Sequence, residues 1–204
     1  LSIYMDNQTQ EGTKNMQKRH TDRESYFDEQ SQTSKNYYIP YIKEVIGHIP
    51  DKVLEVGCGE GGNLLPFAEA GCRVMGVDID ATRIEQARTF FAQRHQQGQF
   101  IATDIFQLKD KATNFPLILL HDVIEHIRDK ERFLSGLQKH LSADGAVFVG
   151  FPAWQMPFGG HQQIAHSHIV SHFPFLHLLP RTLYRWILRL CGEQERVIME
   201  LLDI

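Results

Sequence analysis

The sequence predicts a doubly wound α/β fold, in which strands and helices alternate along the chain and the strands are mainly parallel. Five short apolar runs lie between helix-compatible segments: Lys52–Val56, Cys72–Asp78, Phe100–Thr103, Pro116–Leu120 and Ala146–Phe151. A glycine-rich segment, residues 57–62, follows the first run directly. This arrangement is typical of a strand that turns into a helix at a close approach to a ligand.

The segment before the first strand divides into two parts. Residues 1 to about 33 are polar and without periodicity, so we expect a flexible start, in which Tyr26 and Phe27 could alternatively form a cap over a ligand. Ser34 is a candidate N-cap for a helix that contains Pro40 in its first turn. That helix is expected to pack beside the sheet.

Helices are expected to connect the strands. They are predicted at Asn63–Ala70 with Gly71 as the stop, from Ala81 to about Arg94 with Asp80 as the cap, and from Asp129 to a stop at Gly145. The fourth run, Pro116–Leu120, is apolar almost throughout, as in a central parallel strand covered on both faces. Residues 106–114 fit either a loop or a weak helix.

Composition and charge restrict the class of protein. A chain of 204 residues with a formal net charge of -4 suits one well-cored domain and disfavours nucleic acid as a partner. Its three cysteines, Cys58, Cys72 and Cys191, have no paired spacing, which favours a reducing compartment. There is no signal-peptide pattern and no apolar run of spanning length, so we expect a cytoplasmic protein. The sequence carries no signal for an oligomeric state.

Polar and acidic residues fall at the carboxyl ends of the predicted strands: Glu55, Gly57, Asp78, Asp104, His121 and Asp122. In an open parallel sheet, ligands bind outside the carboxyl ends of the strands. These residues are therefore expected to share one binding site.

The glycine-rich turn fits the dinucleotide fingerprint G-x-G-x-x-G, but Glu55 favours a different nucleotide. A carboxylate at this strand end would repel a pyrophosphate drawn to the turn. S-adenosylmethionine carries no phosphate and has an ammonium and a sulfonium, so it is the cofactor that we predict.

Each part of this cofactor has a predicted contact. Asp78 is expected to accept hydrogen bonds from both ribose hydroxyls, and Ile79 to lie on the adenine face. Asp104 can accept from the adenine amino group, although a turn aspartate is an equal alternative. The predicted cofactor-binding residues are Glu55, Gly57, Cys58, Gly59, Asp78, Ile79, Asp104, Ile105, His121 and Asp122.

These segments resemble the successive motifs of class I S-adenosylmethionine-dependent methyltransferases, most of all the small-molecule subgroup similar to ubiquinone-biosynthesis enzymes. The resemblance covers roughly residues 40–152 and is carried by Glu55–Gly61, Gly76–Ile79, Asp104 and Asp122–His126. It implies a Rossmann-like sheet of strand order 3-2-1-4-5, followed by an antiparallel pair. We find no hairpin after Phe151, so we expect the final pair to be missing.

The remainder of the chain is expected to cover the substrate. We predict a cofactor-binding core at 34–152, and at 153–204 a helical and loop lid with a C-terminal helix in the same domain. Five histidines lie in this segment, without a partner cysteine or carboxylate at metal-site spacing, so no metal is expected. His161 is a candidate proton acceptor. His126 is expected to be a packed histidine, with a catalytic role as the alternative.

The predicted reaction is transfer of a methyl group to a small-molecule acceptor with apolar surface, at oxygen, by in-line displacement. A general base is needed only if the acceptor enters protonated. Two alternatives remain, a catalytically silent cofactor-binding subunit and a nicotinamide-dependent oxidoreductase. A helix that carries Arg181, Arg185 and Arg189 could make weak peripheral contact with a membrane, but packing on the domain is the simpler interpretation.

Overall fold

The structure is a computed structural model that describes residues 22–108, 113–159 and 162–203, and it contains a five-stranded parallel sheet. The strands are β1 (Lys52–Val56), β2 (Arg73–Asp78), β3 (Gln99–Ala102), β4 (Phe115–His121) and β5 (Leu141–Gly150). Their order, β3-β2-β1-β4-β5, confirms the predicted topology. Within the described residues, no strand follows Gly150.

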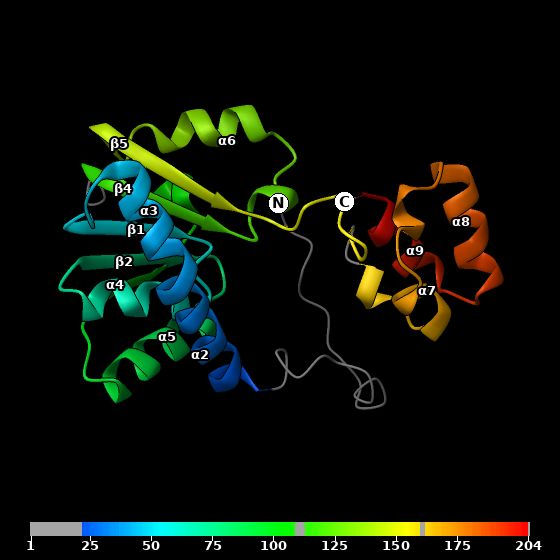
Figure 1. Cartoon of the computed structure of the whole chain (residues 1–204), viewed down its shortest axis with the longest axis horizontal. Coiled ribbons are helices and arrows are strands. Elements are labelled where there is room, and N and C mark those ends of the chain that lie inside the picture. The colour runs from blue at the N-terminus through cyan, green and yellow to red at the C-terminus, as the bar shows by residue number, and fades with distance from the viewer. Residues whose placement is uncertain (1–21, 109–112, 160–161, 204) are drawn as a thin grey trace.

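Helices precede β1 and connect the strands. They are α2 (Arg23–Thr33), the π-helical segment η1 (Ser34–Tyr38), α3 (Ile39–Ile46), α4 (Leu65–Glu69), α5 (Ala81–Gln93) and α6 (Lys130–Leu137). Three short 3-10 turns, η2 (Gly62–Leu64), η3 (Ile105–Gln107) and η4 (Ile124–His126), lie after the carboxyl ends of β1, β3 and β4. Figure 1 shows α6 and α5 on opposite sides of the sheet.

Both faces of the sheet are covered by apolar side chains that alternate along each strand. On one face, Leu117 and Leu119 of β4 belong to a cluster with helices α2 to α5, and on the other Ile118 and Leu120 pack with α6. All four residues are at most 1% exposed, which explains why this run lacks polar residues. The carboxyl ends of the strands are thereby fixed along one edge of a rigid sheet.

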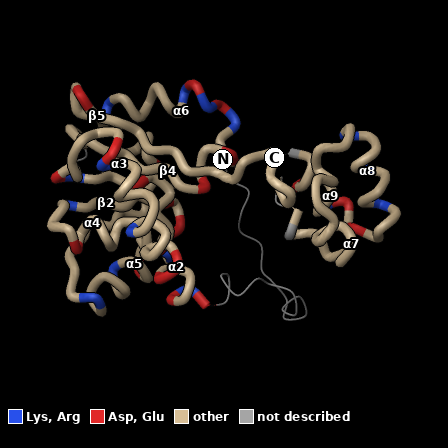
Figure 2. The backbone as a smooth tube through the Cα atoms, viewed as in Figure 1, with Lys and Arg blue, Asp and Glu red and all other residues tan. Residues whose placement is uncertain are grey.

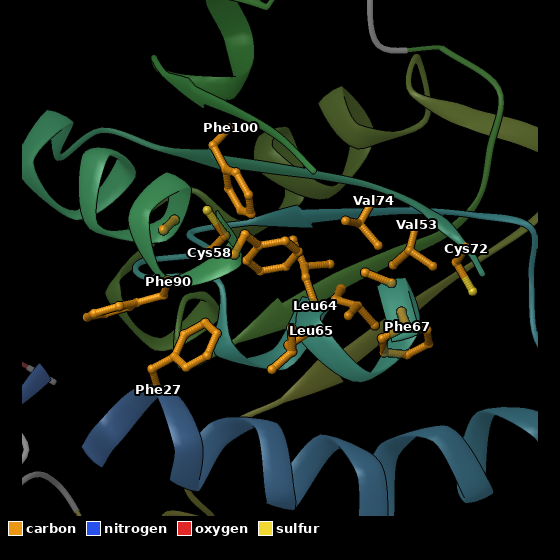
Figure 3. Close-up of a cluster of buried hydrophobic side chains, with 14 of the residues drawn as sticks. Phe27, Val53, Cys58, Leu64, Leu65, Phe67, Cys72, Val74, Phe90 and Phe100 are labelled. Carbon is orange, nitrogen blue, oxygen red and sulfur yellow. The ribbon is translucent and has the colours of Figure 1, made fainter. Parts of the chain in front are cut away.

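The N-terminal helix differs from the irregular segment expected there. The Asp22 carboxylate caps α2 by accepting from the Ser25 backbone N–H at 3.0 Å. Phe27 is 0% exposed, and its ring centroid lies 5.1 Å from that of Phe90 (Figure 3). Ser34 is not the N-cap of a helix; its hydroxyl donates to the carbonyl of Asn63 at 2.8 Å. Residues 23–33 are thus a docked helix, because one aromatic side chain reaches the core.

The start of β5 also differs from expectation. As predicted, Asp129 caps α6, with its carboxylate accepting from the Arg132 backbone N–H at 3.0 Å. However, α6 ends at Leu137, and Gly145 lies inside β5 rather than at a helix terminus. The pairing of β4 with β5 is irregular between Phe115 and Leu117, and a Cβ at Gly145 would lie 2.8 Å from the Phe115 carbonyl oxygen. Glycine permits this close backbone approach at the irregularity.

The last helices form a separate small unit, which we call the C-terminal helical unit (residues 162–203). It consists of the turns η5 (Gln162–Ile164) and η6 (Leu176–Leu178) and the helices α7 (His168–His172), α8 (Arg181–Leu190) and α9 (Glu195–Asp203). Its own core contains Val170, Tyr184, Leu188, Ile198 and Leu201, each at most 2% exposed. Figure 1 shows the unit apart from the sheet, on the right, joined to it by the stretch after β5.

Candidate cofactor site

The glycine-rich turn after β1 has the backbone conformation that its sequence predicts. Gly57, Gly59 and Gly61 all have positive φ values, of 73°, 51° and 82°. The backbone N–H groups of Gly57 and Cys58 both donate to the carbonyl of Val77, at 2.7 and 3.1 Å. The turn is therefore tied to β2 and lies at the carboxyl edge of the sheet.

Gly57 occupies a position in the turn that has no space for a side chain. A Cβ there would lie 2.4 Å from a methyl carbon of Val123. Gly57→Ala should lower the free energy of unfolding by about 2 to 4 kcal/mol, through backbone strain together with overpacking. The matched control is Gly71→Ala, where φ is +87° and nothing lies within 4 Å, so only the backbone term of about 1 kcal/mol applies. Urea unfolding of both variants measures the difference, and equal losses would contradict the packing argument.

Asp78 ends β2 directly beside this turn. One carboxylate oxygen accepts from the Gly59 N–H at 2.8 Å, and the other accepts from the Asp80 N–H at 2.9 Å. Asp80 in turn caps α5 by accepting from the Thr82 N–H at 2.8 Å. Asp80 is thus the helix cap, and the ribose contact of Asp78 stays a prediction. Asp78 is 8% exposed and holds the glycine turn against the end of β2.

Glu55 is buried beneath the turn, with 1% of its surface exposed. The Asn63 side-chain amide donates to one carboxyl oxygen at 2.8 Å, while the second oxygen has no partner among the described residues. Burial raises the pKa of Glu55 to about 8; the Asn63 bond opposes this rise, and the nearby Asp78 carboxylate adds to it. The nearby Arg83 guanidinium also opposes the rise, yet the carboxyl is largely neutral at pH 7 when no cationic ligand is bound.

An ion-pair cluster over the turn was not predicted from the sequence. Glu60 is 0% exposed, and Arg83 of α5 donates to its two oxygens at 3.0 and 2.7 Å. Arg23 of α2 lies 3.2 Å from the same carboxylate. A Cβ at Gly59 would come within 2.1 Å of the Arg83 guanidinium, so this side chain lies directly over the glycine turn. The cluster links α2, α5 and the turn.

The other predicted contacts lie along the same edge. Ile79 follows Asp78 and is 83% exposed, which suits an apolar surface that receives a ring. The Asp104 carboxylate accepts from the Phe106 N–H at 2.9 Å and so caps η3, and Ile105 is buried beneath it. Cys58 is buried within the turn, and burial raises the pKa of its thiol well above the usual value.

At the end of β4, the ring of His121 lies beside Tyr38 of η1, with Asp122 next in the chain. Asp122 has a φ of 52°, and its carboxylate lies 3.7 Å from the His121 ring nitrogen Nδ1. The Tyr38 ring centroid is 5.6 Å from that of His121. Burial, followed by the charges of Asp122 and Glu55, raises the pKa of Tyr38 to about 12, so its hydroxyl stays protonated. Tyr38 was missed because nothing in its local sequence distinguishes it from Tyr37.

Of the two histidines predicted to be catalytic, one lies within the described residues and the other does not. His126 lies in η4 with 55% of its side chain exposed, 4.0 Å from the carboxylate of Glu125. Both carboxylate oxygens of Glu125 are buried and have no hydrogen-bond partner among the described residues. His161 lies outside the described residues. The structure therefore places only His126 near the carboxyl edge, and its catalytic role stays a prediction.

Comparisons with known proteins agree with this geometry. Residues 54–147 match a family described as a methyltransferase domain. The chain is 33% identical over 118 residues to a ubiquinone biosynthesis O-methyltransferase of Bartonella quintana, covering 55% of this chain and 48% of that protein. It is 34% identical over 98 residues to a protein of the same name from Brucella ovis, covering 48% of this chain and 40% of that protein. The chain thus spans about half the length of the curated relatives it matches.

Two solved structures share the fold. A protein from Pyrococcus horikoshii OT3 matches with a TM-score of 0.54 and 23% identity, over 66% of this chain and 65% of that one. A plantazolicin methyltransferase in complex with a desmethyl analogue and SAH matches with a TM-score of 0.53 and 21% identity, over 65% of this chain and 50% of that one. Residues 54–147 thus match a methyltransferase domain, and the α/β part around them resembles the class I S-adenosylmethionine-dependent methyltransferases.

Proposed function

We propose that the chain binds S-adenosylmethionine at the carboxyl edge of its sheet and transfers the methyl group to an oxygen of a small-molecule acceptor. The observation that carries the proposal is the convergence of Glu55 and Asp78, both buried, on a glycine turn at the carboxyl edge of the sheet. The similarity to ubiquinone biosynthesis O-methyltransferases supports an oxygen acceptor. When bound, S-adenosylmethionine supplies a methyl group on a positively charged sulfur, which departs as a neutral thioether.

The residues at this edge fit the parts of that cofactor. Asp78 still has lone pairs with which to accept from the ribose hydroxyls while it holds the turn. Ile79 offers an exposed apolar surface for the adenine ring, and Asp104 lies at the end of the next strand. His121 and Asp122, with Tyr38 over them, occupy the end of β4, where we place the methionine part.

The state of Glu55 refines the electrostatic argument for this cofactor. Because the Glu55 carboxyl is largely protonated in the free chain, it carries only part of a negative charge, and its repulsion of a phosphate is correspondingly weak. A cation placed near its unpartnered oxygen would favour the ionised form and draw the proton off. The buried acid therefore favours binding of a cationic ligand, and this binding is coupled to the release of one proton.

The acceptor end of the site must align the acceptor and take up its proton. Alignment of the acceptor oxygen with the methyl group carries most of the rate, and a phenol or alcohol must also lose its proton to a base. We place His126 as the candidate base, since its side chain is exposed at the carboxyl edge beside Glu125.

We also propose that residues 153–203 cover an acceptor with apolar surface, although the C-terminal helical unit lies apart from the sheet in Figure 1. The free cysteines support a reducing compartment such as the cytoplasm.

A binding and turnover experiment tests the proposal against its two rivals. Calorimetry should show binding of S-adenosylmethionine and its demethylated product, with no binding of NAD⁺ at matched concentrations. Transfer of a radiolabelled methyl group to catechols with apolar tails should then be measured, with His126→Gln slowing turnover at unchanged cofactor affinity. Binding of NAD⁺ in place of S-adenosylmethionine would overturn the assignment. Cofactor binding without transfer to any acceptor would favour the silent subunit.

A further inference from the structure

The α8 helix exposes an apolar stripe that its own core does not use. Leu183, Trp186 and Leu190 are 43%, 58% and 65% exposed. Their spacing of three and four residues places them on one side of the helix. Tyr184 and Leu188, which pack into the core of the C-terminal helical unit, lie on the other side. The stripe therefore faces away from the unit that α8 helps to build.

Residues 145–192 contain arginines but no acidic residue, whereas α9 beside them carries Glu195, Glu200 and Asp203. No aspartate or glutamate occurs between Asp144 and Glu193, whereas α8 carries Arg181, Arg185 and Arg189. Figure 2 shows these positive residues along α8. Arg189 is paired with Glu195 of α9 at 2.9 Å, yet its side chain stays 57% exposed. The net charge of the whole chain is -4, so this segment differs from the rest.

We propose that α8 lies on the surface of a bilayer containing anionic lipids, with Leu183, Trp186 and Leu190 in the interfacial layer. An apolar face that includes tryptophan, on a helix that carries three arginines and no acid of its own, suits the boundary between headgroups and acyl chains. These arginines reach anionic headgroups, and their alkyl stems add apolar contact. Among the described residues no helix has both the length and the apolar character to cross a bilayer, so the contact is peripheral.

The same unit exposes two further apolar side chains. Ile169 of α7 and Phe173, which follows it, are 66% and 58% exposed, and no acid lies between them and α8. In Figure 1, α8 forms the end of the molecule farthest from the sheet. A bilayer can therefore reach the helix without contact with the methyltransferase domain. Tryptophan together with arginines on the same helix is what favours an anionic bilayer surface as the occupant.

Vesicle binding of the whole chain tests the proposal. Trp154→Phe leaves Trp186 as the reporter, and its emission should shift to the blue and become protected from acrylamide with phosphatidylglycerol–phosphatidylcholine vesicles. In co-sedimentation, replacing Leu183, Trp186 and Leu190 with serine should weaken binding at least tenfold. Binding should also weaken severalfold when salt rises from 50 to 500 mM.

A matched variant separates this stripe from apolar exposure in general. Tyr37, Tyr41 and Val45 form a comparable exposed row on η1 and α3, at 69%, 57% and 66% exposure, and their replacement with serine should leave vesicle binding unchanged. Unchanged circular dichroism of both variants shows that folding is retained. Equal binding to pure phosphatidylcholine, or equal loss in the two variants, would overturn the proposal. So would a dimer in light scattering that the α8 substitutions dissociate.

Discussion

Replacing Asp78 with alanine is expected to weaken binding of S-adenosylmethionine by about a hundredfold to a thousandfold. A carboxylate that accepts from two ribose hydroxyls makes two charge-assisted hydrogen bonds, each worth about 1.5 to 3 kcal/mol. The substitution also removes the acceptor for the Gly59 N–H, which loosens the turn that the ligand contacts. Calorimetric titration at 25 °C measures the affinity directly.

The neighbouring aspartate supplies the control for this prediction. Asp80→Ala removes the cap of α5 and should cost about 1 kcal/mol of stability while leaving cofactor affinity within about twofold. Asp78→Asn keeps the volume and one acceptor oxygen, so its affinity should fall between those of the wild type and the alanine variant. An unchanged affinity in Asp78→Ala, with normal circular dichroism, would remove the ribose role from this residue.

Replacing Glu55 with glutamine is expected to abolish a large pH dependence of stability in the ligand-free protein. The folded state raises the pKa of Glu55 from 4.5 to about 8, so it holds a proton that the unfolded chain releases. The free energy of unfolding should therefore fall as the pH rises from about 4.5 to about 8, by about 4 kcal/mol in total. Glutamine stays neutral and can still accept from the Asn63 amide, so the variant should be the more stable protein at pH 8.

Urea unfolding at pH 5 and pH 8 measures this effect as the difference between the variant and the wild type. Glu85→Gln, at a side chain that is 69% exposed, is the control and should change neither value by more than about 0.5 kcal/mol. In the wild type, addition of S-adenosylmethionine at pH 7 should release close to one proton, detectable as a dependence of binding heat on the buffer. A flat stability difference between the two pH values would show that Glu55 is ionised in the free protein.

The sheet and its acidic edge could be predicted because their signals are local in the sequence. A parallel strand that is covered on both faces must be apolar throughout, and Pro116–Leu120 shows this directly. The positive φ values at Gly57, Gly59 and Gly61 follow from the only residue type that adopts them without cost. Because the carboxyl ends of parallel strands share one edge of the sheet, Glu55 and Asp78 lie close together.

The residues that were missed depend on contacts between distant segments. Phe27 lies in a helix of polar residues without an apolar stripe, and it is buried only because Phe90 and Phe91 provide a site for it. In the sequence, Arg83 cannot be distinguished from the other charged residues of α5. Its ion pair with Glu60 appears only in the structure. Gly145 resembles a helix stop, but its role is a close backbone approach inside β5. Periodicity and capping rules do not contain this information.

Residues 23–46 form one uninterrupted helical rod, α2 through η1 to α3, which spans the site from one end to the other. At one end Arg23 contacts Glu60 above the glycine turn, and further along Tyr38 packs over His121. A ligand group that orders either contact therefore restrains the other through the same rigid segment. Adenosine and methionine, added as separate molecules, should consequently bind with positive cooperativity. The ligand that binds first orders residues 23–46, so less conformational entropy is lost when the second one binds.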